Sequence, residues 1–256
     1  MSGATASKAG GQTAGGGDPE DLGHQMPIRD AATIVLVRGA NGSAAGGAAG
    51  GNAQVLMGQR GAKAAFMPNK FVFPGGAIDP DDSLIDLATP LDAAERRRLT
   101  AQPVTEAAPP PEAMIAAAIR ELWEEAGLML GTPGAWQGPL PDDWVAFAAA
   151  GLRPAPDALR FVFRAITPPG RTRRFDARFF LADASAIAAD LDDFSHACEE
   201  LSHLHWIGLD EARGLDLPFV TEVVLAEATA VLRAGRIDSV PFFDNSGPVA
   251  TFRRID

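Results

Sequence analysis

This sequence has few of the residues that several kinds of site require, and cysteine is the clearest case. The single cysteine, Cys198, excludes an internal disulfide and a cysteine-based zinc site, and it fits a reducing compartment. Three of the four histidines, His196, His203 and His205, lack the helical spacing of metal ligands. No apolar run approaches the roughly 20 residues that a membrane-spanning helix needs. The first residues are mostly Gly, Ala and Ser, so we expect no signal peptide.

Basic residues are also in deficit. Lys and Arg number 22 against 33 Asp and Glu, which gives a formal net charge of -11. General binding to nucleic acid or to an anionic membrane needs basic patches, so we expect neither partner. An anionic small molecule would need a metal ion or local arginines to be held in so acidic a protein. We expect a cytoplasmic protein, and the sequence leaves the oligomeric state open, a homodimer included.

The chain divides into a short tail and one domain. Residues 1–25 are rich in Gly, Ala and Ser, a composition typical of disordered tails, and residues 26–256 suit a single domain. Apolar and β-branched runs predict strands at 33–37, 54–57, 159–166, 175–181 and 203–209. The first two form a hairpin around a low-complexity loop at 41–52, and helical patterns cover 92–99, 142–150 and 219–234. Because strands and helices do not alternate strictly, the expected fold class is α+β, with a mixed sheet in an α/β/α sandwich.

The most informative stretch, residues 113–130, reads as a helix that carries clustered glutamates. Glu121, Glu124 and Glu125 fall on one face, because residues three and four positions apart are neighbours on a helix. Like charges at this spacing repel one another, and Arg120 is the only cation among them. Hard cations such as Mg²⁺ and Mn²⁺ take oxygen ligands, so the cluster predicts a metal site. The alternative is a solvated acidic face, which is common on Glu-rich helices.

The residues around this helix resemble the Nudix box, the signature of the Nudix hydrolase superfamily. The box reads Gly, five residues, Glu, seven residues, Arg-Glu-apolar, any residue, Glu-Glu, any residue, Gly-apolar, and every fixed position from residue 112 to residue 128 matches. Position 106 is Glu where the pattern has Gly. The Gly-Gly of the family stands upstream at Gly75-Gly76, as if residues 77–111 had been inserted before the helix. The resemblance implies the Nudix fold, a mixed sheet between helices.

A longer similarity, over residues 28–235, resembles one branch of the superfamily, the insertion-containing, peroxisomal-type coenzyme A diphosphatases and their bacterial relatives. It rests on Gln59-Arg60, on Phe66-Met67-Pro68 before the Phe-Pro-Gly-Gly run, and on the segments 166–168 and 174–180. The chain ends in Arg254-Ile255-Asp256, which differs from a Ser-Lys-Leu-type peroxisomal address, so that location is not carried over.

This resemblance implies metal-dependent hydrolysis of a diphosphate linkage in a nucleoside diphosphate derivative. The branch implies coenzyme A or acyl-CoA as substrate, giving 3′,5′-ADP and (acyl-)4′-phosphopantetheine. Two alternatives stay open: a diphosphatase of the ADP-ribose or NADH type, and a Nudix-fold regulator that binds a ligand without turnover. The intact glutamate triplet favours an enzyme, because a pure binder has no need of a repulsive carboxylate cluster.

The resemblance also implies roles for individual residues of the box. Glu124 and Glu125 would be ligands of Mg²⁺ or Mn²⁺, and Glu121 would be a ligand or the catalytic base. Arg120 would orient the glutamates through charge-assisted hydrogen bonds. The carbonyl of Gly76 would be a further ligand, because glycine lets the backbone approach closely.

Residues outside the glutamate triplet complete the predicted site. Glu112 matches a box position that contacts the metal, often through water, or supports the structure. Glu199 or Glu200 would supply an additional acid or base, the alternative being an ordinary loop acid. Three arginines would bind substrate phosphates, the alternative being solvated surface residues: Arg60, Arg174 and Arg178.

Overall fold

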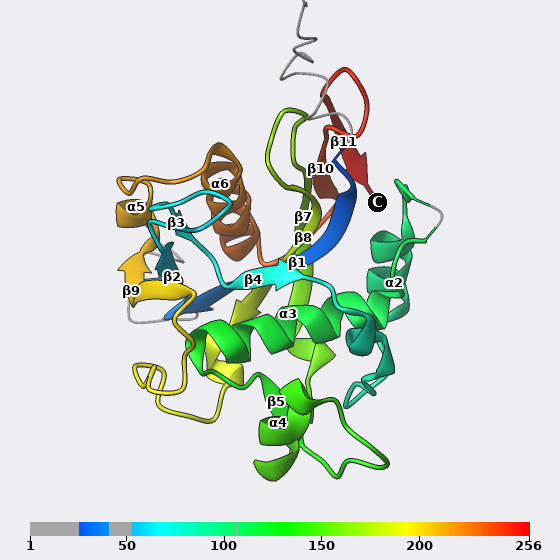
Figure 1. Ribbon diagram of the computed structural model, residues 1–256, viewed down its shortest axis with the longest axis vertical. Coiled ribbons are helices and arrows are strands. Elements are labelled where there is room, and N and C mark those ends of the chain that lie inside the picture. Colours follow the sequence, from blue (N-terminus) through cyan, green and yellow to red (C-terminus); the bar gives the residue numbers. More distant parts are fainter. Residues whose placement is uncertain (1–25, 41–52, 106) are drawn as a thin grey trace, which may run out of the picture.

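A computed structural model describes residues 26–40, 53–105 and 107–256. The predictions for the tail at 1–25 and for the loop at 41–52 lie outside these residues. Figure 1 shows a central sheet with helices on either side and the box helix running across its front. None of the helices in the described ranges combines the length and the hydropathy that crossing a membrane requires.

One mixed sheet forms the centre of the domain. Within the described residues it has nine strands, in the order β11-β10-β7-β8-β1-β2-β3, with β4 paired to β1 and β9 paired to β2. The pairs β1–β8 and β10–β7 are parallel and the others antiparallel. The strands are β1 (Ile28–Arg38), β2 (Gln54–Arg60), β3 (Phe71–Val72), β4 (Gly75–Ala77), β7 (Leu159–Ile166), β8 (Arg174–Asp183), β9 (Leu201–Gly208), β10 (Val240–Asp244) and β11 (Thr251–Ile255).

The five predicted strands are confirmed as β1, β2, β7, β8 and β9, and the hairpin of β1 and β2 is confirmed by its antiparallel register. The other strands of the sheet were not predicted. A separate hairpin that the sequence also did not indicate pairs β5 (Gly131–Pro133) with β6 (Leu152–Pro154). These missed strands have five residues or fewer, too short for apolar alternation to mark them.

Helices cover both faces of the sheet. The α-helices are α2 (Ala93–Thr100), α3 (Pro111–Ala126), α4 (Val145–Ala149), α5 (Leu209–Ala212) and α6 (Phe219–Ala234). Short 3₁₀ turns are η1 (Pro80–Leu84), η2 (Asp142–Trp144), η3 (Pro156–Ala158) and η4 (Ala184–Ala186). The predicted helices at 92–99, 142–150 and 219–234 correspond to α2, to η2 with α4, and to α6.

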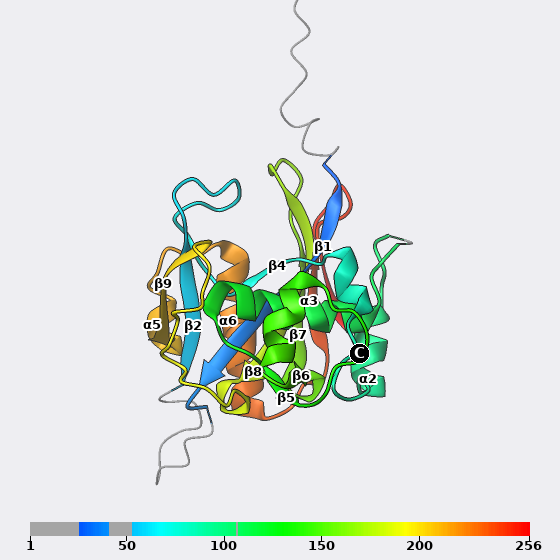
Figure 2. The ribbon, with the colours of Figure 1, turned by 60° about the horizontal axis from the view of Figure 1, so that its bottom comes forward.

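The alternation of side chains along β1 creates two hydrophobic cores. Ile34 and Leu36 pack in the core beneath α3, whereas Val35 and Val37 pack in the core beneath α6. In Figure 2, α3 and α6 lie on opposite sides of the sheet. The predicted α/β/α sandwich with a mixed sheet is therefore confirmed.

The inserted segment 77–111 packs onto the domain through its own apolar residues and through one arginine each of β6 and β7. Leu99 is buried in the α3-side core. Arg164 of β7 donates from Nη1 to the carbonyls of Ala101 and Gln102, at 3.1 and 3.0 Å. Arg153 of β6 donates to the carbonyl of Leu87 at 3.0 Å. These contacts fix the segment against the sheet and place η1 beside α3.

Candidate active site

The box helix α3 has clear signals at both ends. Pro111 occupies its first turn, where a missing N–H costs nothing, and Glu112 adds a negative charge at the positive end of the helix dipole. Gly127 ends the helix in the left-handed conformation (φ 71°), and its N–H donates to Trp123 at 2.8 Å. The helix therefore stops at residue 126, short of the predicted 130. Its inner face, with Ile115, Ile119 and Leu122, is fully buried.

The three glutamates of α3 differ in burial. Glu125 is 2% exposed; its Oε2 accepts a hydrogen bond from the N–H of Gly75 at 2.7 Å, whereas its Oε1 is buried and has no partner among the described residues. Glu121 is 9% exposed, and Glu124 is the most accessible of the three. A Cβ at Gly76 would collide with the Glu121 carboxylate, so any other residue at this position would displace that carboxylate from its present place.

Arg120 contacts more of the site residues than any other described side chain, and the two edges of its guanidinium group bind different partners. Nη1 donates to Glu121 at 2.9 Å and to Glu124 at 3.0 Å. Nε and Nη2 donate to the two carboxylate oxygens of Asp82, both at 2.9 Å. Nη2 also reaches the carbonyl of Ala77 at 3.1 Å.

Asp82 is the main residue that the sequence analysis missed. It lies in η1 of the inserted segment, its side chain is fully buried, and its Oδ2 also accepts the N–H of Asp79 at 2.8 Å. The residue is 38 positions before Arg120, so no local pattern connects the two. The acidic run after Gly75-Gly76 was the one available signal. An inserted segment thus supplies the counter-ion of the box arginine.

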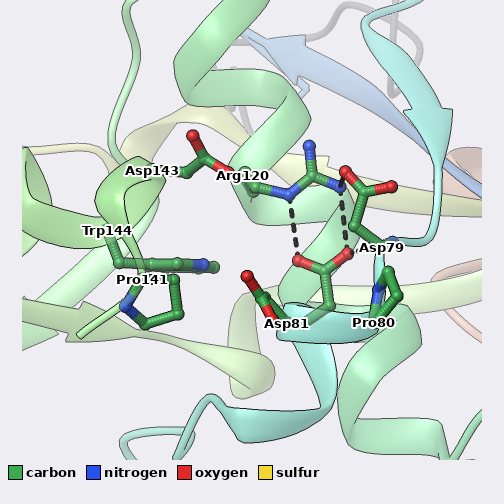
Figure 3. A pocket seen from close by; sticks show the side chains of 8 residues that line it. Asp79, Pro80, Asp81, Arg120, Pro141, Asp143 and Trp144 are labelled. Atoms are coloured by element: carbon green, nitrogen blue, oxygen red, sulfur yellow. Dashed lines mark hydrogen bonds and ion pairs between the residues drawn. The ribbon is translucent and has the colours of Figure 1, made fainter. Parts of the chain in front are cut away.

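A cavity of about 230 Å³ opens beside Arg120, on the side of the inserted segment. Figure 3 shows Asp79, Asp81 and Asp143 around it, with Trp144 forming a flat wall. Three carboxylates around one already neutralised arginine repel phosphate groups. Without a bound cation, the charge of this cavity therefore disfavours an anionic substrate.

The electrostatic cost of this arrangement appears in the pKa values. Burial raises the pKa of Glu121 to about 7, against the attraction of Arg120 and with a smaller contribution from Glu124. Burial also raises the pKa of Glu124, and it raises that of Glu125 well above its ordinary value, with the charge of Glu121 adding to the effect. Burial lowers the pKa of Arg120, but its hydrogen bonds and charge interactions with Asp82 outweigh this and leave the pKa above its ordinary value.

The oxygen atoms here suit a hard divalent cation in their chemistry. A buried, unpartnered carboxylate oxygen on Glu125 and raised pKa values on all three glutamates indicate a site that lacks positive charge. Within the described ranges, however, no group of three or more His, Cys, Asp or Glu side chains is gathered tightly enough to hold a metal ion. Instead, Arg120 Nη1 occupies one oxygen of Glu121 and one of Glu124.

The structure brings Arg60 and Glu200 together at the other edge of the site. Nη2 of Arg60, at the end of β2, donates to Oε1 of Glu200 at 2.7 Å. The loop that carries Glu200 is tied to the end of α3, because the N–H of Cys198 donates to the carbonyl of Glu124 at 2.8 Å. The charges of Glu200 and Arg60 both act on the pKa of Glu125, so this pair borders the glutamates.

Unlike Arg60, the other two arginines predicted to bind phosphate are buried and bound by groups of the protein itself. Arg174 is 5% exposed, and its guanidinium donates to the carbonyls of Thr167 and Asn245, the latter at 2.7 Å. Arg178 is 2% exposed and is bound by Asp30 and Asp176. Both guanidinium groups are occupied inside the protein, so we do not include these residues in the proposed phosphate site.

The remaining predicted acids lie away from the glutamate cluster or have no contact with it. Glu112 forms an ion pair with Arg96 of α2. It precedes Glu121 by nine residues, about 13 Å along a helix, so it supports the packing of α2 on α3. Glu199 is exposed and makes no side-chain hydrogen bond or ion pair with any described residue, so Glu200 is the acid that the structure positions at the site.

This combination of fold and box helix defines the class of the protein. A crystal structure of a NUDIX hydrolase from Alicyclobacillus acidocaldarius superposes with a TM-score of 0.56 and 26% identity, covering 82% of this chain and 95% of that one. Residues 28–146 match the family described as the NUDT19 Nudix domain. Over these residues the chain is similar to the Nudix hydrolases, and its fold is the Nudix fold.

Within that class the similarity is to NUDT19-type proteins. The acyl-coenzyme A diphosphatase NUDT19 of Gallus gallus is 33% identical over 125 residues, which are 41% of this chain and 33% of that protein. The putative nudix hydrolase 7 of Caenorhabditis elegans is 28% identical over 166 residues, 60% of this chain and 46% of that protein. The chain thus spans less than half the length of the curated relatives it matches.

Proposed function

We propose that this protein hydrolyses the diphosphate linkage of coenzyme A or an acyl-CoA, giving 3′,5′-ADP and (acyl-)4′-phosphopantetheine, in a reaction that depends on Mg²⁺ or Mn²⁺. The observation that carries this proposal is the buried, unpartnered Oε1 of Glu125 beside the carboxylates of Glu121 and Glu124. Such an arrangement is unfavourable by itself, because buried charge is costly unless it is paired.

Nudix hydrolases generally use divalent metal ions, and the residues present here have the donor chemistry to hold one. Glu121, Glu124, Glu125 and the Gly76 carbonyl would hold the cation, which neutralises the diphosphate and activates water when bound. Arg120 keeps Glu121 and Glu124 in place from behind, since its other edge is anchored on Asp82. If Glu121 is not itself a ligand of the cation, it would be the base, because in the metal-free site burial raises its pKa to about 7, which suits a proton acceptor.

Arg60 and Glu200 form the substrate side of the proposed site. Their ion pair borders the glutamates, and Arg60 would exchange Glu200 for a phosphate oxygen of the substrate. Glu200, released from Arg60, would then be the additional base. The NUDT19 similarity supports coenzyme A as the substrate class, because that relative is named an acyl-coenzyme A diphosphatase.

The test is kcat/KM for coenzyme A, dephospho-coenzyme A, ADP-ribose and NADH, each with Mg²⁺ and with Mn²⁺. We expect coenzyme A or its acyl derivative to be the best substrate, with products cleaved at the diphosphate. If ADP-ribose or NADH exceeds coenzyme A by about tenfold, which corresponds to about 1.4 kcal/mol in transition-state binding, the coenzyme A assignment is wrong. Absence of turnover with every substrate would favour the binding regulator.

A further inference from the structure

A group of unneutralised cations lies in an otherwise acidic protein. Arg29, Lys63, Arg171 and Arg173, here called the basic rim, are exposed and make no side-chain hydrogen bond or ion pair with a described residue. Two come from the hairpin between β7 and β8, one from the loop between β2 and β3, and one from the start of β1. The two connecting segments, 61–70 and 167–175, contain no acidic residue, although the chain has a net charge of -11.

The segments that carry the basic rim contact one another. Phe66 packs edge-on against Phe175 with ring centroids 5.4 Å apart, and Oγ1 of Thr172 donates to the carbonyl of Ala65 at 3.1 Å. Arg29 is the register partner of Phe175 across the parallel β1–β8 pair. In Figure 2 the loop after β2 and the hairpin between β7 and β8 project from the same side of the sheet. The four cations therefore belong to one surface.

The base of this surface is attached to the site through Arg60. The N–H of Arg60 donates to the carbonyl of Lys70, and the N–H of Asn69 donates to the carbonyl of Arg60, both at 3.0 Å. Lys63 is only three residues beyond Arg60, which borders the glutamates. The cavity beside Arg120, by contrast, is lined by aspartates. A multiply charged anion that reaches the glutamates would therefore extend toward the basic rim.

We propose that the basic rim binds a phosphate group that the substrate carries in addition to its diphosphate. This inference rests on the proposed function, since coenzyme A carries such a group at its 3′ position. Arginine suits the task, because its planar guanidinium binds two phosphate oxygens at once. Arg171 and Arg173 have this freedom, whereas the guanidinium groups of Arg174 and Arg178 are bound internally.

The test compares coenzyme A with dephospho-coenzyme A on wild type, on Lys63→Ala and on the double variant Arg171→Ala/Arg173→Ala. The matched control is Arg97→Ala/Arg233→Ala, which removes two exposed cations that also lack side-chain partners among the described residues. We expect the rim double variant to lose at least about tenfold in kcat/KM for coenzyme A, the effect of one lost charge-assisted hydrogen bond. The value for dephospho-coenzyme A should change less than about twofold, as should both values in the control.

Calorimetric titration with 3′,5′-ADP and with AMP separates this inference from the proposed function, because it needs no turnover. Tighter binding of 3′,5′-ADP that disappears in the rim double variant supports the inference even if the wild type hydrolyses ADP-ribose in preference to coenzyme A. Equal losses for both substrates and both nucleotides overturn it, as does the absence of any loss. Binding to phosphatidylserine vesicles that depends on the rim, without discrimination between the nucleotides, assigns the surface to membranes and also overturns it.

Discussion

Replacing Asp82 by Asn tests whether the inserted segment is part of the active site. The change keeps the size of the side chain and removes its charge, so Arg120 loses its bidentate partner in a place where the two side chains are 4% and 0% exposed. Breaking a buried ion pair by removing one partner costs about 3–5 kcal/mol. Arg120 keeps Glu121, Glu124 and the Ala77 carbonyl, so we expect the lower end, about 3 kcal/mol.

This loss should lower Tm by about 6–12 °C, at about 2–4 °C per kcal/mol for a domain of this size. Turnover should fall as well, because an arginine without its counter-ion draws Glu121 and Glu124 more strongly onto Nη1 and away from a cation. Differential scanning calorimetry and Mg²⁺ titration measure the two effects. The control is Asp81→Asn, an exposed neighbour on the same 3₁₀ turn. If Asp82→Asn melts and turns over like Asp81→Asn, the buried pair has no role in holding Arg120.

Four other predictions concern the glutamates, the bound cation and the tail. Glu124→Gln and Glu125→Gln should fold but lose at least about 100-fold in kcat, since each removes a charged metal ligand. The control Glu112→Gln should stay within about threefold of wild type. Wild-type rates in all three variants would exclude Glu124 and Glu125 from the mechanism. Glu121 binds a proton on folding between its ordinary pKa of 4.5 and its pKa of about 7, so metal-free stability should fall by about 3 kcal/mol as pH rises through that window. Saturating Mg²⁺ needs ionised carboxylates and should therefore raise Tm more at about pH 8 than at about pH 5.5, and an equal rise at both would contradict a carboxylate site. Deleting residues 1–25 should leave Tm and rate nearly unchanged, because such a composition buries too little apolar surface to order itself, and a large loss of Tm would show that the tail docks on the domain.

The long elements of the fold were predictable because each has a local cause. The strand at 159–166 and the helix at 219–234 have the bounds that their patterns predict. The end of α3 was predicted four residues too late, although its cause, a glycine that adopts positive φ, is also local. Strands β10 and β11 were missed because two five-residue segments near a turn carry almost no periodic signal. Their pairing with the sheet depends on contacts between residues that are far apart in the sequence.

The site was predictable to the extent that it is local. Glu121, Glu124 and Glu125 share one face of a single helix by their spacing alone, and two of them, Glu121 and Glu124, accept hydrogen bonds from Arg120 of the same helix. Asp82 could not be found this way, because its contact with Arg120 depends on how the inserted segment packs. Arg174 was predicted to bind phosphate because it lies in the segment 174–180, which resembles the coenzyme A diphosphatase branch. Helices cover both faces of this sheet. The sequence alone therefore does not distinguish an arginine that lines the active site from one that donates to backbone carbonyls in the protein interior.

The most direct measurement of the central claim is product analysis by mass spectrometry after incubation of an acyl-CoA with Mg²⁺ in H₂¹⁸O. We predict equal amounts of 3′,5′-ADP and acyl-4′-phosphopantetheine, with one ¹⁸O atom on a phosphate of one product, and no products from Glu125→Gln. Release of coenzyme A and a carboxylic acid labelled with ¹⁸O would mean thioester hydrolysis, and would contradict diphosphate cleavage at the glutamates of α3.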